Sequence, residues 1–264
     1  MILAPLAALL YLAATGLQVM HIFQQRQQIN RLFVVLSVAA LVCHAVVVWV
    51  SIFPASGMEL GFYKVSALIF LVINILCMAS LARRPLQNLL VVLFPLSALA
   101  VLISYYAPET APIRTDLPPG ILLHIGSSIL AYAVLTLAAA QAALLAAQDH
   151  QLKHRHTRGL VQILPPLQLM ETMLFELLWV GEILLSIAIL SGFVFLDDIF
   201  AQQLVHKTVL TLGAWLLIAV LLWGHYALGW RSKTAVRLTL SGFALLVLAF
   251  FGTKLVLELI LQRP

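Results

Sequence analysis

The sequence predicts an all-α fold, an integral membrane bundle of eight transmembrane helices with both termini extracytoplasmic. The first observation behind this prediction is composition. Of the 264 residues, 63% are hydrophobic and only 9% are charged, with a mean hydropathy of +1.06. A water-soluble domain with this composition would expose one continuous apolar surface. The second observation is that basic charge alternates between successive loops, which is the charge pattern of multi-pass membrane proteins.

A helix needs about 20 predominantly apolar residues to cross a bilayer. Segments of this kind cover residues 1–20, 32–53, 64–82, 88–106, 120–147, 173–196, 207–230 and 236–260. The first segment has no basic stretch before it and no small-residue cleavage site. We therefore expect it to be a retained span rather than a signal peptide.

Charge or proline marks the boundaries of these segments. The first ends before the polar stretch around Arg26, the second at Pro54 and the third at Arg83. The fourth is followed by a stretch with prolines at 108, 112, 118 and 119. Proline removes a backbone donor and clashes with the preceding turn, so no regular helix is expected there.

The last four segments are bounded in the same way. The fifth begins after Pro119, and the longest internal loop, with Pro165 and Pro166, separates it from the sixth. The sixth ends at Asp197, and the seventh ends before Arg231. No loop is long enough to bury a core of its own. We therefore expect residues 1–264 to form a single membrane domain.

The loop charges predict the orientation. The first, third, fifth and seventh loops are basic, with Arg26 and Arg31, Arg83 and Arg84, Lys153, Arg155 and Arg158, and Arg231, Lys233 and Arg237. The other three are acidic or neutral, with Glu59, then Glu109, Arg114 and Asp116, then Asp197 and Asp198. Basic loops stay in the cytoplasm. The net charge of +5 therefore follows from topology, and no nucleic-acid partner is expected.

Four histidines lie within or at the ends of the spans, where an imidazole is costly. At about 1.5 Å of rise per residue, His124 and His206 both lie at the outer boundary of the membrane. His44 lies near the middle of the second span, and His225 lies toward the cytoplasmic side.

Three explanations account for these histidines. Each could be hydrogen-bonded singly to a neighbouring helix. Paired imidazoles could hold haem iron, with His124 and His206 as the axial pair at the outer face and His44 with His225 as a deeper pair. A proton relay could use the histidines with Glu176 and Glu182, which lie in or at the sixth span. No combination of nucleophile, base and orienting group is present, so we expect no enzyme.

Four stretches resemble the CcsA/HemX group of cytochrome c assembly proteins, most closely its YpjD-like inner-membrane members. They read LVCHAVVVW at 41–49, LLHIGSSILAY at 122–132, LLSIAILSG at 184–192 and, within 223–252, GHYALGWRSKTAVRLTLSGFALLVLAFFG. The resemblance covers most of residues 32–255. It implies a multi-pass protein of the bacterial inner membrane, with the lipid bilayer, haem and other membrane proteins as partners.

The resemblance also implies a cofactor, haem b. His124 matches the group's first extracytoplasmic haem-ligand position, and His44 and His225 match its intramembrane histidines. The synthetases of the group carry a tryptophan-rich WWD segment before the seventh span, whereas residues 197–206 contain no tryptophan. The resemblance therefore implies haem binding or haem handling rather than cytochrome c synthesis. The alternative is a non-haem transporter or adaptor with a proton relay.

Overall fold

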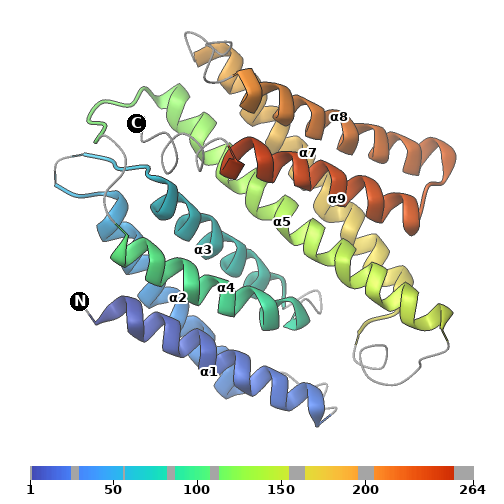
Figure 1. Cartoon of the computed structure of the whole chain (residues 1–264), viewed down its shortest axis with the longest axis horizontal. Helices are drawn as coiled ribbons and strands as arrows, with labels where there is room; N and C mark the ends of the chain where they lie inside the picture. Colours follow the sequence, from blue (N-terminus) through green and yellow to red (C-terminus); the bar gives the residue numbers. More distant parts are fainter. Residues whose placement is uncertain are drawn as a thin grey trace. The chain divides into compact units, whose positions relative to one another are not determined.

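The structure is a computed structural model, and it describes residues 2–24, 30–55, 57–81, 87–107, 113–154, 164–195 and 205–252. The described residues form helices α1 Leu3–Phe23, α2 Arg31–Ile52, α3 Phe62–Ser80, α4 Gln87–Tyr106, α5 Pro119–Lys153, α7 Leu167–Phe195, α8 Val205–Leu228 and α9 Lys233–Val247, which continues as the π-helix η1 Leu248–Gly252 (Figure 1). Eight helices in these ranges are long and apolar enough to cross a membrane. The predicted all-helical fold and its eight spans are confirmed.

Two helices extend beyond the lengths predicted for them. The α5 helix has 35 residues and α7 has 29, whereas about 20 suffice to cross a bilayer. Side chains of α5 bond to the chain around the start of α7, since Gln141 Nε2 donates to the Met170 carbonyl at 3.1 Å and Gln148 Nε2 to the Pro165 carbonyl at 3.0 Å. The last part of the eighth predicted span, after residue 252, lies outside the described residues.

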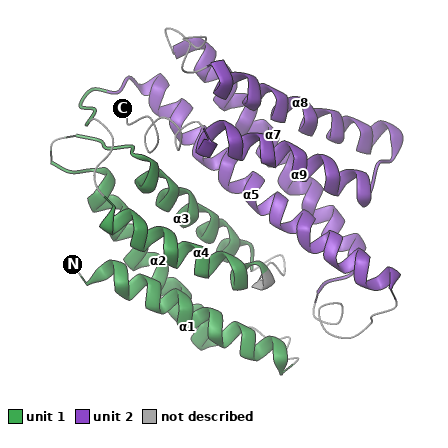
Figure 2. Ribbon diagram, in the orientation of Figure 1, with its two compact units in different colours: residues 1–116, 264 green, residues 117–263 purple. Residues whose placement is uncertain are grey.

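Contacts divide the chain into two compact units, Met1–Asp116 and Leu117–Arg263 (Figure 2). In the first unit, α1 packs against α2 and α4, and α3 closes the bundle by packing against the same two helices. In the second unit, α5 packs against α7 and α9, and α8 closes the bundle by packing against the same two helices. Each unit is therefore a four-helix bundle. The prediction of one domain over residues 1–264 stays a prediction.

Aromatic rings fill the core of the first unit. The Phe94 ring lies 5.0 Å from that of Tyr11 and 6.0 Å from that of Phe33, measured between centroids, and all three side chains are almost fully buried. The next residue, Pro95, lies inside α4. Proline within a helix leaves one carbonyl without its usual donor. Large rings around that turn bury apolar area and hold α4 against α1 and α2.

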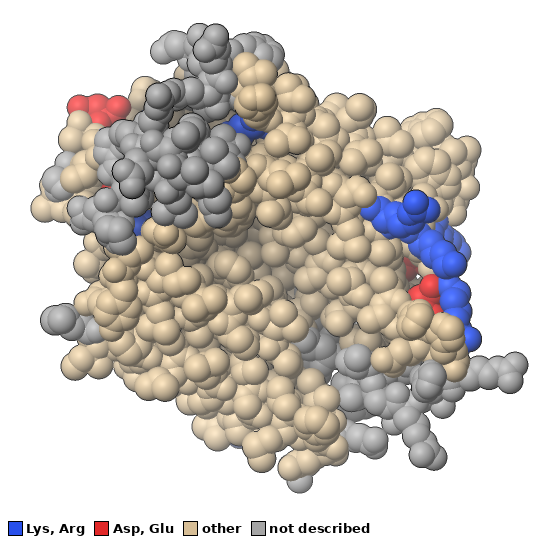
Figure 3. Space-filling view, viewed as in Figure 1, with Lys and Arg blue, Asp and Glu red and all other residues tan. Residues whose placement is uncertain are grey.

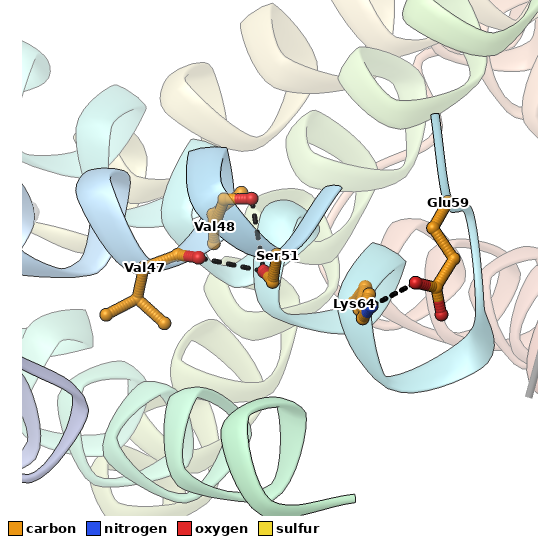
Figure 4. Close-up of polar contacts among 5 residues, drawn as sticks. All are labelled: Val47, Val48, Ser51, Glu59 and Lys64. Atoms are coloured by element: carbon orange, nitrogen blue, oxygen red, sulfur yellow. Dashed lines mark hydrogen bonds and ion pairs between the residues drawn. The ribbon is translucent and has the colours of Figure 1, made fainter. Parts of the chain in front are cut away.

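An ion pair closes the loop between α2 and α3 (Figure 4). Glu59 is only 1% exposed and its carboxylate accepts from the ammonium of Lys64, in the first turn of α3. Ser51, in the last turn of α2, donates its hydroxyl to the Val47 carbonyl at 2.8 Å. A buried carboxylate needs a partner of opposite charge. Glu59, the acidic residue of the second loop, therefore forms an ion pair within the protein.

Basic side chains gather at one end of the second unit. Figure 3 shows Lys and Arg over the turn between α8 and α9, beside a broad face without charge. Arg231, Lys233 and Arg237 lie exposed in this region. The predicted topology places this end of the unit on the cytoplasmic side.

The orientation prediction can be tested with single cysteines in a background where Cys43 and Cys77 are replaced by alanine. We expect a cysteine at Thr115 to react with an impermeant maleimide added to intact cells. A cysteine at Lys233 should react only after the cells are permeabilised. Both positions are exposed, so a difference in labelling reports the side of the membrane. Labelling of position 233 in intact cells would contradict the predicted topology.

Candidate functional site

His124 lies about one and a half turns from the start of α5 and bonds to another helix. Its Nδ1 lies 2.7 Å from the backbone carbonyl oxygen of Ala188 on α7. A carbonyl oxygen can only accept, so Nδ1 carries the proton and Nε2 keeps its lone pair. The ring is half-buried. The geometry therefore fixes both the tautomer and the orientation of the imidazole.

The local sequence explains this placement. Pro119 is the first residue of α5, where its fixed φ suits a helix start and its missing N–H costs nothing. Gly120 then lies against the ring of Phe195, and a Cβ at this position would be 2.3 Å from that ring. This close approach brings together the beginning of α5 and the end of α7, which places His124 within reach of Ala188.

Ser127 follows His124 at the i+3 position, on the same side of α5. Its hydroxyl donates to the Leu123 carbonyl at 2.7 Å, within its own helix. This hydrogen bond is the usual one for a serine inside a helix.

A lysine that the sequence reasoning missed lies at the same end of the second unit. Lys207, in the first turn of α8, places its ammonium 5.7 Å from the centroid of the Phe250 ring in η1. One signal could have found it, because a lysine at the predicted outer boundary runs against the positive-inside tendency.

His206 directly precedes Lys207 and is exposed. Successive residues of an α-helix point about 100° apart. The side of α8 that carries Lys207 over Phe250 is therefore not the side from which His206 projects. His206 as the second axial ligand beside His124 stays a prediction.

His225 lies at the other end of α8, in a compact turn. Its Nδ1 donates to the Trp230 carbonyl at 2.7 Å, and its ring stacks on Phe175 of α7 with centroids 3.5 Å apart. The Trp230 ring covers Gly224, where a Cβ would lie 2.3 Å from it. Gly229 supplies the positive φ, +68°, that the turn requires. As at His124, the hydrogen bond leaves the Nε2 lone pair.

His44 belongs to the first unit, and its environment is different. Its ring is fully buried, and Nδ1 lies 3.1 Å from the hydroxyl of Tyr11 on α1. In the same bundle, the amide of Asn74 on α3 donates to the Ser97 hydroxyl on α4 at 2.6 Å. Two buried polar pairs thus link helices of the first unit, α1 with α2 and α3 with α4. No sequence pattern indicated them.

The two acids of the sixth predicted span lie in different surroundings on α7. Glu176 is exposed. Glu182 is 7% exposed, and neither carboxylate oxygen has a hydrogen-bond partner among the described residues. The nearby Ser186 donates to the Glu182 backbone carbonyl and accepts from Trp215 Nε1 at 2.9 Å, so its hydroxyl is already engaged.

These environments differ in how far they would suit an axial haem ligand. An axial imidazole needs a free Nε2, with Nδ1–H held by a backbone carbonyl or carboxylate. His124 and His225 meet this requirement. His44 also has an Nε2 without a hydrogen-bond partner among the described residues, but its ring is fully buried and its Nδ1 is paired with the Tyr11 hydroxyl rather than with a carbonyl or carboxylate. Its ligand role stays a prediction. The predicted pair of His44 and His225 has one member in each unit. Within the described ranges, no three His, Cys, Asp or Glu residues converge on a metal site.

Comparison with known proteins gives consistent matches. A model of the family "Cytochrome C assembly protein" matches residues 3–261. The inner membrane protein YpjD of Escherichia coli K12 is 32% identical over 261 residues, which are 98% of this chain and 99% of that protein. An uncharacterized 28.8 kDa protein of Azospirillum brasilense is 33% identical over 198 residues, 74% of this chain and 71% of that protein. No solved structure matches.

Proposed function

Because this chain belongs to the cytochrome C assembly protein family, we propose that it binds haem b and that His124 holds the iron. The chain is a multi-pass inner-membrane protein related to YpjD. We propose that it holds or passes haem within the membrane and performs no covalent chemistry on it. It is therefore proposed to be a binding protein rather than an enzyme.

The observation that carries this proposal is the hydrogen bond from His124 Nδ1 to the Ala188 carbonyl at 2.7 Å. This bond aligns the imidazole, makes Nδ1 the protonated nitrogen and leaves the Nε2 electron pair for iron. An outer partner of this kind also raises the basicity of a ligating histidine.

Each nearby residue would contribute one element of binding. His124 supplies the axial nitrogen, and Ala188 orients it. The bound haem would supply a redox-active iron and a large apolar surface. Helix faces of the second unit are rich in aliphatic and aromatic residues, and such faces favour burial of a macrocycle away from water.

A titration of the purified full-length protein with hemin tests the proposal. We expect saturable binding with a sharpened Soret band, shifted from that of hemin in the same detergent. Two imidazole ligands would give the split visible bands of low-spin iron. The comparison is with empty micelles at the same hemin concentration. If hemin partitions equally into micelles with the protein and into empty micelles, the protein has no haem site.

Glu182 favours a second candidate function, proton transfer without haem. Moving an isolated carboxylate into an apolar core is costly, so such a group is held as the neutral acid. Glu182 is buried in α7 and neither oxygen has a described partner, which suits a site that takes up a proton. The hemin titration separates the two candidates, since absence of binding would favour this one.

A further inference from the structure

The end of α5 carries two exposed histidines one helical turn apart. His150 lies in the last turn of the helix, and His154 is the C-cap residue. Residues at i and i+4 share one face of an α-helix, and the centroids of these two rings are 4.4 Å apart. The His154 N–H donates to the His150 carbonyl at 3.2 Å and so closes this turn. The two imidazoles therefore stand side by side.

This part of α5 exceeds the length that a membrane span requires. The helix has 35 residues, whereas about 20 cross a bilayer. The predicted topology places the extra turns on the cytoplasmic side. Exposed imidazoles there can exchange water for a metal ion, and neutral imidazole is the commonest metal ligand among protein side chains.

A neighbouring ion pair balances the charge of the lysine that lies between the two histidines in the sequence. The ammonium of Lys153 is paired with the carboxylate of Asp149. Each of these residues directly precedes one of the histidines, so the pair lies about 100° around the helix from them. The C-terminal end of an α-helix also carries partial negative charge, which favours a cation at this position.

The separation of the two rings suits a shared metal ion. Zn²⁺ lies about 2.0–2.1 Å from an imidazole nitrogen. The ion is then roughly 3.2 Å from the ring centroid, so two imidazoles on adjacent coordination positions have centroids about 4.5–5 Å apart. The observed 4.4 Å is close to this range. Because both side chains are exposed, small rotations about their side-chain bonds can turn one nitrogen of each toward the ion.

We propose that His150 and His154 form a binding site for one divalent transition-metal ion. One imidazole nitrogen of each residue coordinates the ion, and water fills the remaining positions. Imidazole suits Zn²⁺, Ni²⁺ and Cu²⁺, and Cu²⁺ binds most tightly of the three to a given nitrogen site. The site is independent of the proposed haem site. A bound ion would hold the last turn of α5 closed, since only the helical conformation places both ligands on one face.

The test is a titration of the full-length protein with Zn²⁺ and with Cu²⁺ in detergent micelles. The protein is purified with a tag that contains no histidine, treated with EDTA and then dialysed. We expect His150→Ala and His154→Ala each to bind both ions at least about tenfold more weakly than the wild type. Loss of an outer partner of a metal ligand already costs 10–100-fold, and these variants lose a ligand. The variant with both substitutions should bind about as weakly as either single variant, because one imidazole cannot chelate.

A spacing control keeps the number of histidines and changes only their geometry. The variant with His154→Ala and Leu152→His moves the second imidazole to the i+2 position, away from the face of His150. Leu152 is itself exposed, so the substitution disturbs no core. This variant should bind as weakly as His154→Ala.

Hydrogen exchange supplies a second measurement that does not depend on affinity. Saturating Zn²⁺ should slow exchange of the His154 amide, which closes the last turn of α5, because a local opening must then release the ion. The slowing is expected in the wild-type protein and not in His150→Ala.

Equal affinity in the wild-type protein and both single variants would overturn the proposal, because other groups would then hold the ion. A loss in only one of the two variants would overturn it as well, since the ion would not be shared between them. Wild-type affinity in the i+2 variant would show that the helical spacing is irrelevant, and a wild-type protein that binds neither ion has no such site. None of these outcomes bears on the haem titration, which contains no added divalent metal.

Discussion

Replacing His124 with alanine is expected to lower the affinity for hemin by more than about 100-fold. Removing only the outer hydrogen-bond partner of a metal-bound histidine lowers the metal affinity about 10–100-fold. This substitution removes the ligand itself. Any haem that remains bound should have a five-coordinate spectrum. Added imidazole should restore the Soret band, because a free ligand can enter the space that the side chain leaves.

Variants of the other histidines show whether this loss is specific. His150→Ala changes an exposed residue near the end of α5 and should leave the spectrum unchanged. His206→Ala tests the predicted second ligand, and a five-coordinate spectrum in this variant would support it. Loss of haem in His44→Ala or His225→Ala, with His124→Ala unaffected, would place the site elsewhere and refute our assignment.

The second large effect is expected at His44, and it is an effect on stability. His44→Ala should lower the free energy of unfolding by about 2–4 kcal/mol, because it empties a buried volume and leaves the Tyr11 hydroxyl without one partner. Tyr11→Phe keeps the ring and removes only the hydroxyl, so a smaller loss, about 0.6–1.7 kcal/mol, is expected. Unfolding by SDS in mixed micelles measures both changes.

A double variant tests whether the two residues act together. If the hydrogen bond at 3.1 Å couples them, the losses in Tyr11→Phe and His44→Ala should add to more than the loss in the double variant. His150→Ala again serves as the matched exposed histidine. Unchanged stability in His44→Ala would contradict a structural role for His44. It would favour the ligand role implied by the family resemblance.

The sequence alone determined the helices of this protein. Apolar segments of sufficient length, separated by charge and proline, predicted eight spans, and the described residues contain eight helices of that kind. The length of a bilayer-crossing helix is fixed by membrane thickness. The family could also be predicted, because the motifs around His44, His124 and His225 lie in a distinctive order.

Only the tertiary structure decided which side chains face one another. In a soluble helix the apolar stripe marks the buried face, but in a membrane helix the lipid-facing side is apolar as well. On α2, for example, Val42 and Val46 are exposed while Val47 and Val48 are buried. Sequence periodicity therefore could not show that His44 points inward to Tyr11.

The same limit applies at the candidate site. The partner of His124 is a backbone carbonyl 64 residues away, and a carbonyl leaves no signal in the sequence. Depth along the helix predicts that His124 and the start of α8 lie at one level. Rotation about the helix axis, about 100° per residue, decided that Lys207 lies over Phe250 while His206 is exposed. That rotation is set by helix packing, which depends on all four helices of the unit together.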